Sequence, residues 1–120
     1  MPDVVSVADQ LARLSRDEHD YAEFFRSPSQ SLSLTVARWP AGSVDTQQPH
    51  TEDEVYYVIG GRATLVTNGA ATTVSAGSVA FVASGVDHRF VDITEDLEVL
   101  VFWSPARHSN EPASGEPASA

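Results

Sequence analysis

Residues 42–61 read GSVDTQQPHTEDEVYYVIGG, and this stretch carries most of the information about the fold and about a site. Gln48, His50 and Glu54 follow one another at intervals of two and four residues. In extended chain their side chains therefore leave the same face of the backbone. The β-rich run VYYVI follows directly, and a Gly-Gly pair ends it. The spacing predicts that three polar side chains point toward one place at the start of a β-strand.

The rest of the chain predicts an all-β domain. Runs with apolar residues at alternate positions recur between residues 31 and 103, and turn sequences such as Asn68-Gly69 separate them. Short strands at this density are typical of a β-sandwich or a β-barrel. The expected strands cover residues 31–39, 55–59, 63–67, 71–74, 78–82, 89–93 and 97–103.

The two ends of the chain have a different pattern. Ser6 can cap a short helix, because apolar residues recur every three or four positions from residue 7 to residue 14. We therefore assign residues 1–30 to an N-terminal helical segment that packs on the barrel, and residues 31–104 to the barrel itself. Residues 105–120 consist mainly of Ser, Pro, Glu, Ala and Asn, so we predict a disordered tail.

Ten residues stand at the spacings of two sequence motifs: Gly42, Gln48, His50, Glu54 and Gly61, then Gly77, Ala83, Gly85, His88 and Asp92. The first motif is glycine, five residues, His-x-His, three residues, glutamate, six residues and glycine, and Gln48 replaces its first histidine. The second is glycine, five residues, Pro-x-Gly, two residues, histidine, three residues and asparagine. Ala83 and Asp92 replace its proline and its asparagine. With both motifs in the right order, the chain resembles a small single-domain cupin, which implies a double-stranded β-helix, the cupin jelly-roll barrel.

The resemblance also implies a metal site. In metal-binding cupins the two histidines of the first motif, its glutamate and the histidine of the second motif are the ligands. By position these are Gln48, His50, Glu54 and His88, which would hold one divalent metal ion. The last three residues alone form a two-histidine, one-carboxylate set, which suits Fe(II), Mn(II) or Zn(II) and leaves coordination positions open. Gln48 could add an amide oxygen, or could instead hydrogen-bond a substrate or a water molecule.

Simpler explanations exist for the same residues. His50 and His88 could be ordinary core or surface histidines, since some cupins keep the barrel without the metal. Glu54 ends an acidic run with Glu52 and Asp53, and such a run is usually a solvated turn. The strand that begins next to Glu54 favours an inward orientation for this residue.

Other strand residues predict the surroundings of the site. Tyr56 and Phe90 are in phase with the expected ligands, so we predict that they line the pocket. Val55, Tyr57 and Ile59 are in the opposite phase and are equally apolar, which a solvent-exposed sheet face would not favour. Either the N-terminal helix or a second protomer is expected to cover them, and we expect a homodimer.

Composition excludes several classes of function. The chain of 120 residues has no cysteine, which rules out disulfides and cysteine-ligated metals. Its formal net charge of -10 disfavours nucleic acid and anionic membranes as partners. The N-terminal sequence lacks the pattern of a signal peptide, so a cytoplasmic location is expected.

We therefore expect a metalloenzyme that acts on a small organic molecule. A dioxygenase would need a redox metal such as Fe(II), whereas an isomerase, lyase or cyclase would need only Lewis acidity. Tyr56 or Glu52 could carry the proton in that second case. The alternative is a non-catalytic cupin that binds or senses a small molecule.

Overall fold

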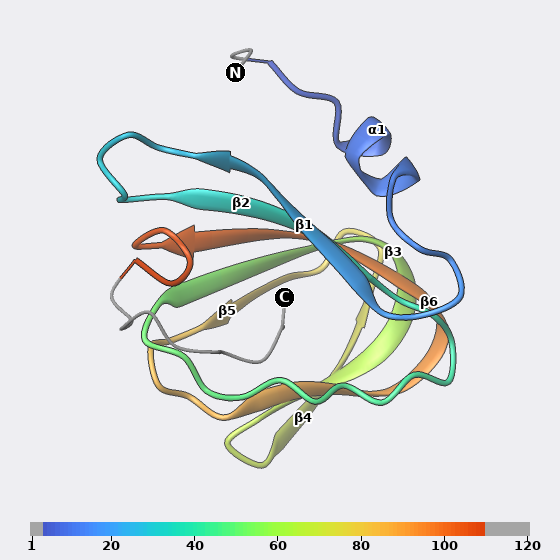
Figure 1. Cartoon of the computed structure of the whole chain (residues 1–120). Coiled ribbons are helices and arrows are strands. Elements are labelled where there is room, and N and C mark those ends of the chain that lie inside the picture. Colours follow the sequence, from blue (N-terminus) through green and yellow to red (C-terminus); the bar gives the residue numbers. More distant parts are fainter. Residues whose placement is uncertain (1–3, 110–120) are drawn as a thin grey trace.

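The computed structural model describes residues 4–109, which form one helix and six strands in an antiparallel arrangement (Figure 1). The elements are α1 (Val7–Ala12), β1 (Asp20–Arg26), β2 (Ser33–Trp39), β3 (Asp53–Thr67), β4 (Ala70–Ser75), β5 (Val79–Val82) and β6 (His88–Ser104). The strand order is β1-β2-β6-β3-β4, and β5 pairs with the first part of β3, at residues 54–57. The predicted all-β fold is confirmed.

Strands β3 and β6 are long, and their bending closes the barrel. Their pairing shifts register three times between Val58 and Thr64, which marks the bend in β3. Gly61 lies within this bend at a φ of +91°. A Cβ atom there would come within 2.1 Å of the Asp96 carbonyl oxygen, so only glycine allows the two strands to approach. The glycine that ends the first motif is thus explained by the curvature of β3.

The interior of the barrel contains a cluster of buried apolar side chains. Its core includes Trp39, Val58, Leu97, Val99 and Val101, each at most 1% exposed. Alternation along β2, β3 and β6 directs these side chains inward, as expected for strands with one face on the core. The predicted Asn68-Gly69 turn joins β3 to β4, with φ values of +47° and +82° that suit a tight hairpin.

The N-terminal segment contains both the predicted helix and a strand that was not predicted. Ser6 caps α1, as expected, by accepting a hydrogen bond from the Asp9 amide. Leu11 and Leu14 of this segment are buried against Val36 of β2. The missed strand is β1, whose register shifts between Glu23 and Phe25. This bulge breaks the two-residue period on which the sequence prediction depended.

Strand β2 is buried on both faces, whereas the sequence indicated one buried face. The predicted apolar phase, which includes Val36, packs against α1 on the outside of the barrel. The other phase faces inward, where the hydroxyl group of Thr35 accepts a hydrogen bond from the indole of Trp103 at 3.1 Å. A small polar side chain satisfied in this way can occupy a core position.

The chain after β6 turns back against the barrel. Ala106 is fully buried, and its amide donates a hydrogen bond to the carbonyl oxygen of Gln30. Arg107 is 8% exposed, and its amide bonds to the hydroxyl group of Ser33. We expected disorder from residue 105 onward, but residues 105–109 pack on the barrel because their backbone groups find partners in the β1–β2 region. The rest of the expected tail, residues 110–120, lies outside the described residues.

The outer face of β3 is covered at one end only. Ile59 packs against the cluster formed by α1 and β2. Toward the other end Tyr57 is 41% exposed, and its neighbours Val79 and Phe81 on β5 are 68% and 62% exposed. The helix therefore covers part of the face that the sequence marked as apolar, and the remainder is open. The single helix among residues 4–109 is too short and too polar to cross a membrane.

Candidate metal centre

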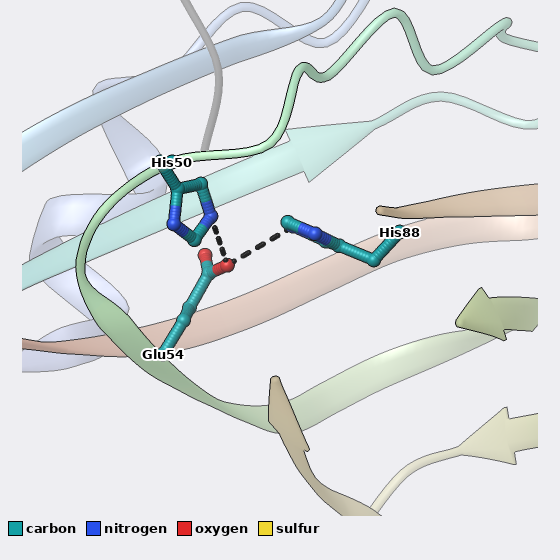
Figure 2. A group of neighbouring side chains, drawn as sticks. All are labelled: His50, Glu54 and His88. Carbon is teal, nitrogen blue, oxygen red and sulfur yellow. Dashed lines mark hydrogen bonds and ion pairs between the residues drawn. The ribbon is translucent and has the colours of Figure 1, made fainter. Parts of the chain in front are cut away.

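Three side chains converge at one end of the barrel from three places in the sequence (Figure 2). His50 lies in the loop before β3, Glu54 is the second residue of β3, and His88 is the first residue of β6. The two motifs meet through the backbone, because the Gly85 amide donates a 2.7 Å hydrogen bond to the His50 carbonyl oxygen. Gly85 has a φ of +77°, which suits the turn that brings His88 to this end of the barrel.

Both histidines point their Nε2 atoms at the same carboxylate oxygen. His50 Nε2 lies 2.9 Å from Glu54 Oε1, and His88 Nε2 lies 3.1 Å from it. The side chains of Glu54 and His88 are fully buried, and that of His50 is 8% exposed. The structure thus brings together three of the four residues predicted as ligands.

The far nitrogen of each imidazole ring faces a backbone carbonyl oxygen. His50 Nδ1 lies 3.2 Å from the Glu52 oxygen, and His88 Nδ1 lies 2.9 Å from the Val86 oxygen. A carbonyl oxygen only accepts hydrogen bonds, so Nδ1 carries a proton in both rings. In the neutral rings both Nε2 lone pairs then face the Glu54 carboxylate. Such an arrangement is stable only with a further proton on Nε2 or with a cation between the three atoms.

Several observations fit a metal ion at this place. Within the described chain, His88 Nε2 and Glu54 Oε2 are buried without a hydrogen-bond partner. Ligands bound to one metal at about 2.1 Å lie about 3 Å apart when they are adjacent, which agrees with the two distances of 2.9 and 3.1 Å. The ligand atoms of His50, Glu54 and His88 all lie within 4.8 Å of one another. The group could therefore hold a divalent ion.

The charges around the site affect two titrating groups. Burial lowers the pKa of His88, but the Glu54 carboxylate and the Val86 carbonyl outweigh it, so the net pKa lies above the ordinary 6.5. Burial raises the pKa of Tyr56 well above 10.0, and the carboxylates of Glu54 and Asp45 raise it further. Tyr56 therefore keeps its phenolic proton at neutral pH.

Gln48, the fourth predicted ligand, does not join this group. Its side chain is exposed, and its amide nitrogen donates a 3.4 Å hydrogen bond to the Thr46 carbonyl oxygen. Gln47 points inward instead, donating to Asp45 at 2.6 Å and accepting from the Tyr56 hydroxyl group at 2.9 Å. Coordination by Gln48 stays a prediction.

The two predicted pocket residues lie next to the group. Tyr56 and Phe90 are buried, and their rings contact edge to face at 5.0 Å. The Tyr56 ring centroid lies 6.2 Å from that of His88. Their place in the interior agrees with their phase in the strands, while contact with a substrate stays a prediction.

Sequence reasoning missed Asp45, a buried carboxylate near the site, and named Glu52 only as a candidate for proton transfer without predicting its burial. Asp45 accepts hydrogen bonds from the Phe90 amide and from Gln47. Glu52 is fully buried, although the acidic run indicated a solvated turn. Glu52 lies two residues from both His50 and Glu54, so in extended chain its side chain points to the same face as theirs. This spacing could have predicted its burial.

The fold and the ligand set agree with the family comparison. Residues 35–104 match the cupin domain family, so the chain belongs to the cupins. An uncharacterized protein of Streptomyces coelicolor is 42% identical over 98 residues, which cover 81% of this chain and 91% of that protein.

Solved structures of cupins resemble this chain at lower identity. KdgF from a Halomonas species has a TM-score of 0.67 at 22% identity and covers 74% of this chain and 80% of its own. A predicted oxalate decarboxylase from Thermotoga maritima has a TM-score of 0.62 at 25% identity, with coverages of 72% and 80%. The DMSP lyase DddQ from Ruegeria pomeroyi has a TM-score of 0.69 at 24% identity, with coverages of 84% and 54%.

Proposed function

We propose that this cupin binds one divalent metal ion through His50, Glu54 and His88 and acts as a metal-dependent enzyme on a small organic molecule. One observation carries the proposal: two Nε2 atoms, each with its Nδ1 atom facing a carbonyl oxygen, converge on one buried carboxylate oxygen. Fe(II), Mn(II) and Zn(II) all accept this ligand set.

The metal ligands and Tyr56 would have different roles in catalysis. When bound, the metal ion would supply Lewis acidity, which polarises oxygen atoms of a substrate. His50, Glu54 and His88 would hold the ion, and a three-residue ligand set would leave coordination positions open for substrate oxygens. Tyr56 holds a proton beside Glu54, in a surrounding that excludes water. Because the ligand side chains are at most 8% exposed, the site suits a small substrate.

Among the possible reactions we favour a lyase, isomerase or cyclase over a dioxygenase. A dioxygenase requires a redox metal, whereas the other three need only charge stabilisation by the ion. The similarity to a predicted oxalate decarboxylase at 25% identity supports bond cleavage of this kind. The competing function is a cupin that binds a small molecule without converting it, because the same barrel can carry either role.

Elemental analysis of the gently purified protein tests the metal site. We expect about one ion per chain in the wild type and almost none in His88→Ala. The loaded protein is then offered hydroxy acids, dicarboxylic acids, diketones and phenols, while oxygen uptake and product formation are followed. Product without oxygen uptake supports the favoured class, and oxygen uptake supports a dioxygenase. Binding without turnover supports the non-catalytic alternative, and equal metal content in both proteins contradicts the site.

We also propose that the open part of the outer face is a homodimer interface. Tyr57, Val79, Phe81 and Phe102 are exposed there and carry no charge, although the chain as a whole has a formal charge of -10. Two acidic copies repel one another except through an uncharged face. A groove of about 300 Å³ beside Phe102 could receive a protruding side chain of the second copy, as in a self-complementary interface. A cytoplasmic location stays a prediction that cell fractionation would test.

A further inference from the structure

Glu52 is a buried carboxylate that the proposed metal site does not use. It is fully buried, and its Oε1 atom has no hydrogen-bond partner among the described residues. This atom lies 3.7 Å from His50 Nδ1, on the side of the ring that faces away from Glu54. Burial of a carboxylate costs free energy unless the group interacts with a positive charge or a hydrogen-bond donor. The N–H group of His50, 3.7 Å away, provides an electrostatic contact of this kind without a hydrogen bond.

The segment after β6 holds Glu52 in this position. Glu52 Oε2 accepts a hydrogen bond from the backbone amide of His108. On another side the His50 ring packs edge-on against Trp103 at 4.7 Å. The guanidinium group of Arg107 lies over Trp103 at 5.4 Å and over Tyr21 at 5.0 Å. The segment after β6 therefore fixes both neighbours of the His50 ring, the carboxylate and the indole.

The two histidines differ in what lies behind them. His88 Nδ1 bonds to the carbonyl oxygen of Val86, a neutral group. His50 Nδ1 faces both the carbonyl oxygen of Glu52 at 3.2 Å and its carboxylate at 3.7 Å. A carboxylate behind a metal-binding imidazole fixes the ring and strengthens its other nitrogen as a donor.

We propose that Glu52 is the positioning residue of His50. Through its carbonyl and carboxylate oxygens it keeps Nε2 directed at Glu54 and increases the affinity of that nitrogen for a divalent cation. The backbone of residue 108 holds the carboxylate in place, so the segment after β6 contributes to metal retention. This inference rests on the proposed metal site.

The test compares Zn²⁺ affinity in four full-length proteins: wild type, Glu52→Gln, Glu95→Gln and His88→Ala. Glu52→Gln keeps the size of the side chain and an acceptor for the His108 amide, but removes the charge behind His50. Glu95 is exposed on β6, so Glu95→Gln controls for the loss of one negative charge anywhere in the chain. Titrations against a competing chelator give Kd, and thermal unfolding of the metal-free proteins reports folding. The visible absorption of the Co²⁺-loaded proteins reports the ligand field.

We expect Glu52→Gln to raise the Zn²⁺ Kd about 10-fold or more and to shift the Co²⁺ bands, with the thermal midpoint of the metal-free protein little changed. Glu95→Gln should bind like the wild type. Equal affinity and spectra in Glu52→Gln and the wild type would overturn the role of Glu52 while leaving the metal site intact. If the wild type binds no better than His88→Ala, the metal site itself is wrong.

A structure of the Zn²⁺-loaded wild type gives a second measurement, which decides the matter even if Glu52→Gln fails to fold. The inference requires Nε2 of His50 on the ion and Nδ1 facing Glu52. Coordination through Nδ1, or a Glu52 carboxylate turned away from the ring, would overturn it.

Discussion

The two faces of strand β3 both carry apolar and aromatic residues, but the inner face is completely buried and the outer face is only partly buried. On the inner face Glu54, Tyr56 and Val58 are all fully buried. The Tyr56 hydroxyl group donates a hydrogen bond to Gln47, and Glu54 Oε1 faces the two histidines. On the outer face Ile59 is covered by the helix region, whereas Tyr57 stays 41% exposed. The comparison shows that alternation determines which side chains of β3 point inward. Burial of the outward side chains depends instead on other elements that pack against them, here α1 and β2.

The largest expected effect concerns Arg38 of β2, which joins the helix segment to the outside of the sheet. Arg38 is 2% exposed and donates hydrogen bonds to Glu98 and to the carbonyl oxygens of Leu11, Leu14 and Ser15. Arg38→Met would leave these acceptors without their donor, so we expect a loss of about 3 kcal/mol in the free energy of unfolding. Denaturant unfolding measures it.

The control for this substitution is Arg26→Met. Arg26 also pairs with a glutamate, Glu23, but both side chains are about a third exposed. Such a pair contributes less than about 1 kcal/mol. Equal losses in the two variants would mean that Arg38 does not hold the helix on the sheet.

The next effect concerns the inner face. Glu54→Ala removes the carboxylate that both histidines share, so Zn²⁺ should no longer stabilise the protein. At a metal concentration of 100 times Kd the wild type should gain about 2.7 kcal/mol. Thermal unfolding with and without Zn²⁺ measures the gain, and Glu95→Ala is the matched exposed control. A full gain in Glu54→Ala would place the ion elsewhere.

The sequence predicts some elements of this structure and not others. Alternation and the two motifs were sufficient for the barrel and for bringing His50, Glu54 and His88 together. Strand β1 was missed because its bulge breaks the alternation, and the packing of residues 105–109 depends on backbone hydrogen bonds that composition does not reveal. Those bonds join positions far apart in the chain, so no local pattern encodes them.

The open part of the outer face should control assembly. Phe81 is 62% exposed beside Tyr57, so Phe81→Ser should weaken the proposed homodimer about 10-fold, or about 1.4 kcal/mol, without unfolding the protomer. Light scattering across a concentration series gives the mass. Val44→Ser is the control, since Val44 is 81% exposed in a loop. A wild type that is monomeric at every concentration would contradict the interface.

The smallest expected effect is at Gln48, where the motif and the structure differ. The motif places a ligand at this position, but the side chain is exposed and bonds to Thr46. Gln48→Ala should therefore change the Zn²⁺ Kd by less than about 3-fold, because an exposed side chain that makes one weak hydrogen bond contributes little. Gln47→Ala is the informative partner, since it removes the amide that joins Asp45 to Tyr56 in the interior. A loss of affinity that is larger for Gln48→Ala than for Gln47→Ala would show that Gln48 turns inward when metal binds.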